Sequence, residues 1–154
     1  MADNDTPNSE PPERSQEQEL LQALKHYSEK VVRIWATRRN WGEMAQPDGV
    51  GEAASDCQDS IRLQLRLRHG RVLDASFVSE GCGATFACAS AAAELARGRT
   101  AQGLLTLTPQ DVLEELEGLP AHNAHCADLA IDALRRAASD LLSTSAHPWK
   151  RLYR

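Results

Sequence analysis

The sequence predicts an α+β domain, in which a small antiparallel sheet has helices packed on it. A run of alternating apolar and polar residues predicts a strand, and a turn containing glycine predicts a hairpin. Apolar residues spaced three or four positions apart predict helices on both sides of the hairpin. The 154 residues are enough for one domain whose core needs no disulfide bonds. A helix, a small sheet and then further helices is an α+β arrangement.

The first helix is predicted from Glu17 to about Arg38. Its apolar residues recur every three or four positions, at Leu20, Leu24, Tyr27, Val31 and Ile34. A stretch rich in glycine, proline and aspartate follows and predicts a long loop. Within that loop, residues 49–54 are a candidate for a third strand.

The clearest strand signal begins at Ile61. The apolar residues Ile61, Leu63, Leu65 and Leu67 alternate with Arg62, Gln64, Arg66 and Arg68. A turn at His69-Gly70 leads to a returning strand, for which Leu73, Ala75 and Phe77 are predicted to form the inner face. We interpret the arginine row as the solvated outer face of a half-buried sheet rather than as a surface that binds a partner.

Three helices are predicted after the hairpin. The first runs from about Ala84 to Arg97 and ends at Gly98. The second begins at Thr108-Pro109-Gln110-Asp111, which combines a capping threonine, a proline in the first turn and an acid at the third position, and it ends at Gly118. The last runs from about Ala124 to Leu142. Its predicted inner stripe is Cys126, Leu129, Ala133, Leu134, Ala137 and Leu141.

Composition divides the chain into three parts. Residues 1–16 are predicted to be a disordered acidic tail, residues 17–143 the folded domain, and residues 144–154 a frayed C-terminal tail. The N-terminal residues resemble neither a signal peptide nor a transit peptide, so we expect a cytoplasmic protein. A net charge of −5 gives no general attraction to nucleic acid, and no apolar run approaches the ~20 residues of a membrane span. We therefore expect neither a nucleic-acid partner nor a membrane.

Three of the four cysteines lie at the ends of predicted elements. Cys82 stands between two glycines at a strand-to-helix turn, where the positive end of the helix favours the thiolate. Cys126 lies in the first turn of the last helix, beside His125. Cys57 precedes the first clear strand, and in an extended segment Asp59 would face the same side. Two interpretations of these three cysteines are equally compatible with the residues alone. They form one shared site, or they are three unrelated thiols.

Two further residues are interpreted as lying outside any site. Cys88 is six residues past Cys82, about 120° around the helix from it, and is predicted to be a small buried residue. His122 precedes His125 by three residues and is predicted to be a solvated loop histidine rather than an additional ligand.

Five segments, in this order and spacing, resemble the U-type iron–sulfur cluster scaffold family, which includes IscU and the NifU N-terminal domain. They are Tyr27-Ser28-Glu29-Lys30-Val31 with Arg39-Asn40-Trp41-Gly42, Cys57-Gln58-Asp59, Gly81-Cys82-Gly83-Ala84, Glu114-Glu115-Leu116-Glu117-Gly118-Leu119-Pro120, and His125-Cys126. The resemblance covers about residues 24–142 and implies a three-stranded sheet with packed helices.

The resemblance also implies a role and a ligand set. Such a scaffold accepts sulfur from a cysteine desulfurase, takes iron from a donor and builds a transient cluster, which it passes to apo iron–sulfur acceptor proteins. We expect this cluster to be [2Fe-2S]. By position, the family's cysteine ligands fall on Cys57, Cys82 and Cys126, and its other site residues on Asp59 and His125. Cys126 is the implied sulfur acceptor, which requires an exposed thiolate there. Zinc could occupy the same ligands in the isolated protein.

The chain departs from the family pattern at four places. Gln58 stands where the family has glycine, and Trp35 and Arg38 replace a common histidine and proline. The proline-valine-lysine stretch that many members present to a dedicated chaperone is Ala121-His122-Asn123, so this partner is not carried over to the chain.

Two other functions use the same ligands. One is a zinc-bound sulfurtransferase of the SufU type with Cys126 as sulfur carrier, and the other is a structural zinc domain. The 44-residue step from Cys82 to Cys126 leaves no room for the insert of the SufU branch, which favours a scaffold that is not an enzyme. A site in glycine-rich loops also disfavours a closed structural zinc site.

Overall fold

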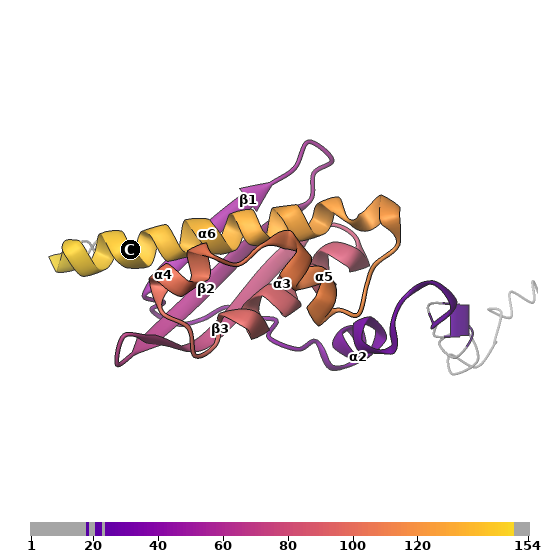
Figure 1. Cartoon of the computed structure of the whole chain (residues 1–154), viewed down its shortest axis with the longest axis horizontal. Coiled ribbons are helices and arrows are strands. Elements are labelled where there is room, and N and C mark those ends of the chain that lie inside the picture. Colours follow the sequence, from indigo (N-terminus) through magenta and orange to yellow (C-terminus); the bar gives the residue numbers. More distant parts are fainter. Residues whose placement is uncertain (1–17, 19–20, 23, 150–154) are drawn as a thin grey trace, which may run out of the picture.

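Three antiparallel strands form one sheet in the order β1-β2-β3, and the helices α3 (Gly83–Ala96) and α6 (His125–Ala146) pack on one of its faces (Figure 1). The strands are β1 (Gly49–Ala54), β2 (Ser60–Arg68) and β3 (Arg71–Glu80). The α+β class and the three-stranded antiparallel sheet predicted above are confirmed, including its first strand. The computed structural model describes residues 18, 21–22 and 24–149, so the predicted tail at 1–16 lies outside the described residues.

The helices after the hairpin start where the sequence predicts them. They are α3 (Gly83–Ala96), α5 (Pro109–Glu115) and α6 (His125–Ala146), with a short α4 (Ala101–Leu105) and a 3-10 turn η1 (Ala121–Asn123) that were not predicted. Thr108 and Asp111 form the expected capping box at the start of α5. The helix α6 continues past the predicted end at Leu142, because Thr144 is buried in its last turn.

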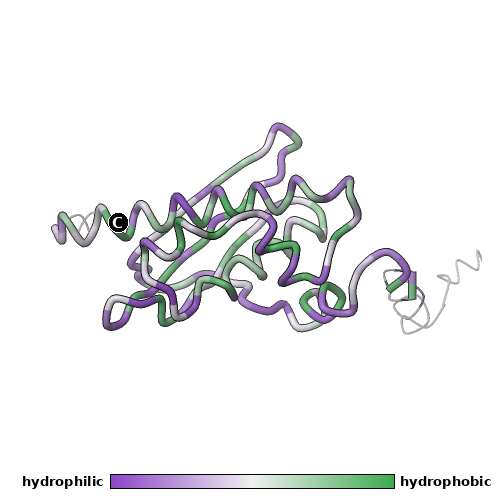
Figure 2. Tube along the Cα trace, in the orientation of Figure 1, coloured by the Kyte–Doolittle hydropathy of each residue, from purple (hydrophilic) through white to green (hydrophobic). Residues whose placement is uncertain are grey.

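The helix α3 lies at the centre of the molecule. Its alanines are buried almost all the way round, and it contacts β3 on one side and α2, α5 and α6 on others. Figure 2 shows hydrophobic residues along α3 and hydrophilic ones at the turn between β2 and β3. A helix that is apolar on every face belongs in a core, and its small side chains let three neighbouring helices approach it closely.

A β-bulge changes the predicted inner face of β3. Leu67 pairs with Val72 and Arg66 with Asp74, so Leu73 has no partner on β2. Leu73 is therefore exposed, and Val72 takes the inner position that the sequence assigned to Leu73. An extra residue in one strand reverses which side chains face inward beyond the bulge. A sequence pattern that alternates every two residues does not show where such a bulge lies.

The first predicted helix is broken in two. Described residues 24–26 are helical, Tyr27 and Ser28 are not, and α2 (Glu29–Thr37) begins afresh. Ser28 caps α2 by accepting a hydrogen bond from the Val31 amide, and its hydroxyl donates to the Leu116 carbonyl. Leu24, predicted to be on the buried stripe, is 44% exposed.

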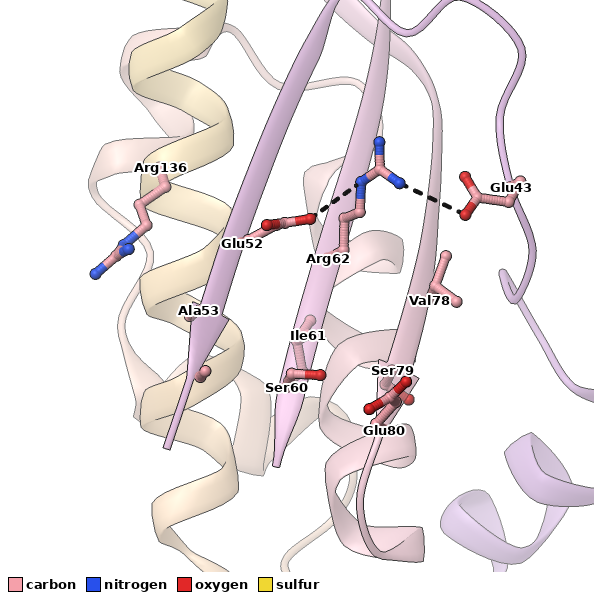
Figure 3. A pocket seen from close by; sticks show the side chains of 11 residues that line it. Glu43, Glu52, Ala53, Ser60, Ile61, Arg62, Val78, Ser79, Glu80 and Arg136 are labelled. Atoms are coloured by element: carbon pink, nitrogen blue, oxygen red, sulfur yellow. Dashed lines mark ion pairs between the residues drawn. The ribbon is translucent and has the colours of Figure 1, made fainter. Parts of the chain in front are cut away.

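The loop between α2 and β1 covers part of the outer face of the sheet. Its start runs beside β3, where Trp41 and Phe77 form a parallel bridge, and Gln64 is buried beneath it, contacting Glu43 and Met44. Figure 3 shows Arg62 between Glu43 and Glu52, at 3.5 and 3.4 Å, in a pocket on this face of about 500 Å³. The outer face of the sheet, which was predicted to be solvated, is thus partly covered, and its Arg62 forms ion pairs.

The turn between β1 and β2 contains a strained residue. Gln58 has φ = +65°, a left-handed conformation that glycine adopts freely and other residues do not. The turn is closed by hydrogen bonds from the Ser55 amide to the Asp59 carbonyl (2.8 Å) and from the Gln58 amide to the Ser55 carbonyl (3.2 Å). The chain therefore keeps a tight turn without the glycine that such a turn favours.

The helix α6 lies directly on the backbone of β1. A Cβ built on Gly51 would stand 2.1 Å from the Ala133 carbonyl oxygen and 2.2 Å from the Ala137 nitrogen. Gly49 is similarly close to Leu141 and Ala137. Only glycine fits at Gly51, because backbone atoms of the helix cannot move aside as a side chain could. Among the described residues, no helix is both long and apolar enough to cross a membrane.

We predict that Gly51→Ala destabilises the protein by about 3 kcal/mol or more, because the added methyl group forces α6 away from the sheet. Urea denaturation measures the change. The neighbouring variant Glu52→Ala is the control, since it removes only an exposed ion pair and should cost below about 1 kcal/mol. Equal stability of the two variants would contradict the close contact.

We predict that Gln58→Gly stabilises the protein by up to about 1 kcal/mol, because relief of the left-handed conformation exceeds the entropy cost of glycine. The matched control is Gln110→Gly in α5, an exposed helical position, where the same substitution should destabilise by about 1 kcal/mol. Both changes are read from denaturation midpoints, and destabilisation by both substitutions would refute the prediction.

Candidate functional site

Three connections meet at one end of the sheet. Ser60 pairs with Ala54 on one side and with Glu80 on the other, so the β1–β2 turn and the β3–α3 turn lie next to each other. The first turn of α6 lies at the same end, because the side chains of His125 and Asp59 meet there. The register of the sheet therefore brings together the residues that follow β1, follow β3 and begin α6.

Asp59, His125 and Cys126 form a cluster of potential ligands. One carboxylate oxygen, one ring nitrogen and the thiol sulfur all lie within 4.8 Å of one another. The Nε2 atom of His125 lies 3.9 Å from the Asp59 Oδ2 atom and 3.6 Å from the Cys126 Sγ atom. Ligand atoms around tetrahedral zinc are roughly 3.3–3.8 Å apart, given bonds of ~2.0–2.3 Å. A small closure would bring all three atoms to bonding distance of one metal ion.

A backbone contact fixes the orientation of the His125 ring. Its Nδ1 atom lies 3.1 Å from the His122 carbonyl oxygen, and because a carbonyl can only accept, Nδ1 carries the proton. The neutral ring then has its lone pair on Nε2, the atom that faces Asp59 and Cys126. This is the arrangement that metal-binding histidines adopt. His122 itself lies in η1 with an exposed side chain and contributes its carbonyl rather than its ring.

Cys82 and Cys126 approach each other through a threonine. The hydroxyl oxygen of Thr85 lies 3.4 Å from the Cys82 sulfur and 3.5 Å from the Cys126 sulfur. Thr85 is fully buried in the first turn of α3, whereas Cys82 caps that helix and is exposed. Sequence reasoning missed Thr85, although residues three apart on a helix share a face, which is the signal that could have found it.

The two thiols differ in their tendency to ionise. Partial burial opposes ionisation of Cys82, but hydrogen bonds from the Thr85 hydroxyl and from the Thr85 and Ala84 amides outweigh it and lower the pKa of this thiol. Burial raises the pKa of Cys126 to about 11, and the charges of Cys82 and Asp59 add to that effect. The lowered pKa of Cys82 agrees in direction with the expectation for a thiol at the start of α3, whereas the exposure expected at Cys126 is wrong, because Cys126 is fully buried.

Glycines on both sides of Cys82 have distinct steric reasons. Gly81 has φ = +135°, and a Cβ there would lie 2.1 Å from the Asp59 Oδ1 atom, so the absent side chain leaves room for the carboxylate. A Cβ on Gly83 would lie 2.9 Å from the ring of Trp35. The Trp35 Nε1–H group donates to the Gly83 carbonyl at 2.8 Å. Trp35 is thus a second residue of the site region that sequence reasoning did not assign to it.

Cys57 lies apart from the cluster. It is exposed in the β1–β2 turn, and its sulfur is not among the atoms that lie within 4.8 Å of one another. Sequence reasoning placed Cys57 and Asp59 on one side of an extended segment. That expectation is wrong, because Gln58 is left-handed and Asp59 turns inward to 9% exposure while Cys57 faces solvent. Cys88 is buried as predicted, and its burial raises the pKa of its thiol.

A groove runs beside Cys82. It has a volume of about 360 Å³ and is lined by Trp35, Arg38, Trp41, Ser79, Gly81, Cys82, Gly83 and Phe86. The Arg38 guanidinium lies 5.3 Å from the centre of the exposed Trp41 ring. Aromatic groups therefore border the accessible Cys82 thiol, and Thr85 links this thiol to Cys126 of the polar cluster.

Comparison with known proteins agrees with this geometry. The profile of the NifU-like N terminal domain matches residues 26–147. The chain is 39% identical over 115 residues to the iron–sulfur cluster assembly scaffold protein IscU 1 of Archaeoglobus fulgidus, covering 74% of this chain and 75% of that protein. It is 35% identical over 122 residues to IscU of Escherichia coli, covering 76% and 94%.

Solved structures share the fold. A NifU-like N-terminal protein from Brucella abortus superposes with a TM-score of 0.59 at 19% identity, over 80% of this chain and 98% of that one. A protein described as a cluster assembly scaffold of the SUF system from Fervidobacterium islandicum gives 0.58 at 17% identity, over 73% and 96%. The family match spans the sheet, the helices and all five residues of the expected ligand set, and so the chain belongs to the NifU-like N-terminal domain family of U-type scaffolds.

Proposed function

We propose that this protein is an iron–sulfur cluster assembly scaffold. It would accept sulfur from a cysteine desulfurase and iron from a donor, build a [2Fe-2S] cluster, and transfer it to apo-proteins. The observation that carries the proposal is the convergence of Asp59, His125 and Cys126, in a chain whose relatives are named as such scaffolds. Thiolate, imidazole and carboxylate together suit iron and zinc rather than magnesium or calcium.

We propose Cys57, Cys82 and Cys126 as the thiolate ligands, completed by Asp59 or His125. Iron–sulfur clusters are held by thiolates, and a weaker fourth ligand leaves the cluster easier to release. The burial pattern supports a temporary site, because Cys57 and Cys82 are exposed while Cys126 is buried. Cys57 would reach the bound iron–sulfur cluster by movement of the strained β1–β2 turn, because only Gln58 separates it from Asp59.

Sulfur transfer to Cys126 requires its thiolate. In the proposed step, that thiolate attacks the outer sulfur of the desulfurase persulfide, which forms a persulfide on Cys126 and releases the desulfurase cysteine as thiolate. The raised pKa of Cys126 opposes this step in the free protein. A metal ion deprotonates a thiol that coordinates it.

Two alternatives use the same residues. The fold does not distinguish a SufU-like sulfurtransferase from a scaffold, because a SUF-system protein has the same fold. The 44-residue step from Cys82 to Cys126 favours the scaffold. A structural zinc site would be closed, whereas the His125 side chain is 53% exposed. We propose the cytoplasm as the compartment, because all four cysteines are free thiols, as is usual in a reducing compartment.

Anaerobic reconstitution with iron, cysteine and a desulfurase tests the proposal, with visible absorption and transfer to an apo-ferredoxin as readouts. We predict that Cys57→Ser, Cys82→Ser and Cys126→Ser each lose most of the cluster absorption. Cys88→Ser is the matched control and should keep it, because Cys88 is buried and its high pKa keeps it protonated. Absence of a cluster in the wild-type protein, with zinc retained and persulfide formed, would support the sulfurtransferase instead.

We predict that iodoacetamide modifies the thiols of the metal-free protein in a defined order. Cys82 should react at pH 7 and its rate should level off early, because its pKa is lowered. Cys126 should react slowly at pH 7, with a rate that climbs about tenfold per pH unit toward pH 11. Peptide mass spectrometry follows each site, with exposed Cys57 as internal reference. Equal rates for Cys82 and Cys126 at pH 7 would contradict the assigned shifts.

We predict that Asp59→Ala forms a cluster that leaves the protein more slowly. A carboxylate is a harder and weaker partner for the cluster than a thiolate, so it can exchange with an incoming acceptor thiol. The half-life of transfer to an acceptor is compared with the wild type. Unchanged transfer would assign the exchangeable position to His125, whose side chain is more exposed than that of Asp59, 53% against 12%.

A further inference from the structure

The hydroxyl of Thr85 occupies an unusual position between two thiols. It lies 3.4 Å from the Cys82 sulfur and 3.5 Å from the Cys126 sulfur, although these cysteines are 44 residues apart. Threonine hydroxyls inside helices usually bond back to a carbonyl one turn earlier. Here the hydroxyl contacts sulfur on both sides, and the side chain is fully buried. A buried hydroxyl without a partner would cost about 1–3 kcal/mol, so the sulfurs satisfy a real requirement.

We propose that Thr85 is a positioning residue of the thiol site: its hydroxyl holds the Cys82 and Cys126 side chains toward one bound metal or cluster and donates a hydrogen bond to a ligand sulfur. The inference rests on the proposed function for the identity of the cargo. A hydroxyl carries one hydrogen, so with both thiolates bound it donates to one of them. That hydrogen bond withdraws electron density from the sulfur, and hydrogen bonds to sulfur raise the reduction potential of a cluster.

The surroundings of Thr85 favour this role over simple packing. A valine has nearly the same shape and would fill the same space without placing a hydroxyl between two thiols. The contact joins the first turn of α3 to the first turn of α6, so it also links the exposed ligand to the buried one. Hydrogen-bonding partners of metal ligands typically change metal affinity 10–100-fold when removed.

Anaerobic titration of the metal-free protein with Co²⁺ tests the inference without sulfur or a desulfurase. Thr85→Val should bind Co²⁺ about tenfold more weakly and shift the sulfur-to-cobalt charge-transfer band to lower energy. Thr85→Ser keeps the hydroxyl and should restore both values. In reconstituted protein, the Val variant should have a more negative reduction potential. Ser90→Ala is the control, since it removes another buried hydroxyl of α3, bonded to the Arg39 carbonyl, and should leave the Co²⁺ spectrum unchanged.

Wild-type affinity and spectrum in a folded Thr85→Val protein would overturn the proposal, as would wild-type protein that binds no Co²⁺. Thr85→Ala is the second variant without a hydroxyl. If both of these variants unfold while Thr85→Ser folds, the role is structural and the proposal fails. Failure of cluster assembly alongside a Co²⁺ site that depends on Thr85 would refute the scaffold function and leave this inference standing.

Discussion

The direct contact between the α6 backbone and the β1 backbone determines where the site can form. Gly51 lets Ala133 and Ala137 approach closer than any side chain would allow. Gly49 does the same for Leu141, which lies one turn further along α6 than Ala137. These contacts of two glycines of β1 with Ala133, Ala137 and Leu141 fix how far α6 can slide over the sheet. The first turn of α6 begins eight residues before Ala133, so fixing this register also fixes His125 and Cys126 at the end of the sheet where β1 ends and β2 begins.

At that end of the sheet, small residues leave space that ligand groups occupy. The absent side chain of Gly81 accommodates the Asp59 carboxylate, which turns inward while Cys57 stays in solvent. The carbonyl of His122 then orients the His125 ring so that its lone pair faces that carboxylate and the Cys126 sulfur. The proposed ligands are thus arranged before any cargo is bound, and they lie at the ends of elements: Asp59 at the end of the β1–β2 turn, His125 and Cys126 in the first turn of α6. Such a site can be formed in advance and still open to release what it binds.

The sequence predicted the elements whose signals are local and failed where distant contacts decide. The stripe of α6 and the capping box at Thr108 depend on neighbouring residues, and both are confirmed. The break at Ser28 depends on a hydrogen bond to Leu116, 88 residues away, which no local period contains. The Asp59 side chain points inward and the Cys57 side chain outward because Gln58 has a left-handed backbone conformation. A glutamine in the sequence does not predict that conformation. Cys126 is buried where α6 packs against α3, as its place on the predicted inner stripe implied, and the structure contradicts only the exposure that the sulfur-acceptor role implied for it.

The departures of this chain from the family pattern affect one side of the thiol site more than the other. Arg38 ends α2 with φ = +49°, which a proline, held near −65°, cannot adopt, so the backbone here follows a course that a proline at this position would exclude. That course leaves Arg38 beside the Trp41 ring, while Trp35 is held against Gly83 by its indole hydrogen bond. Both replaced residues therefore line the groove next to Cys82, whereas Asp59, His125 and Cys126 lie in the separate cluster of potential ligands. The groove borders the exposed Cys82 thiol, whereas the buried Cys126 thiol belongs to the cluster with Asp59 and His125. Substitutions in the groove can therefore alter what reaches Cys82 without changing the groups of that cluster.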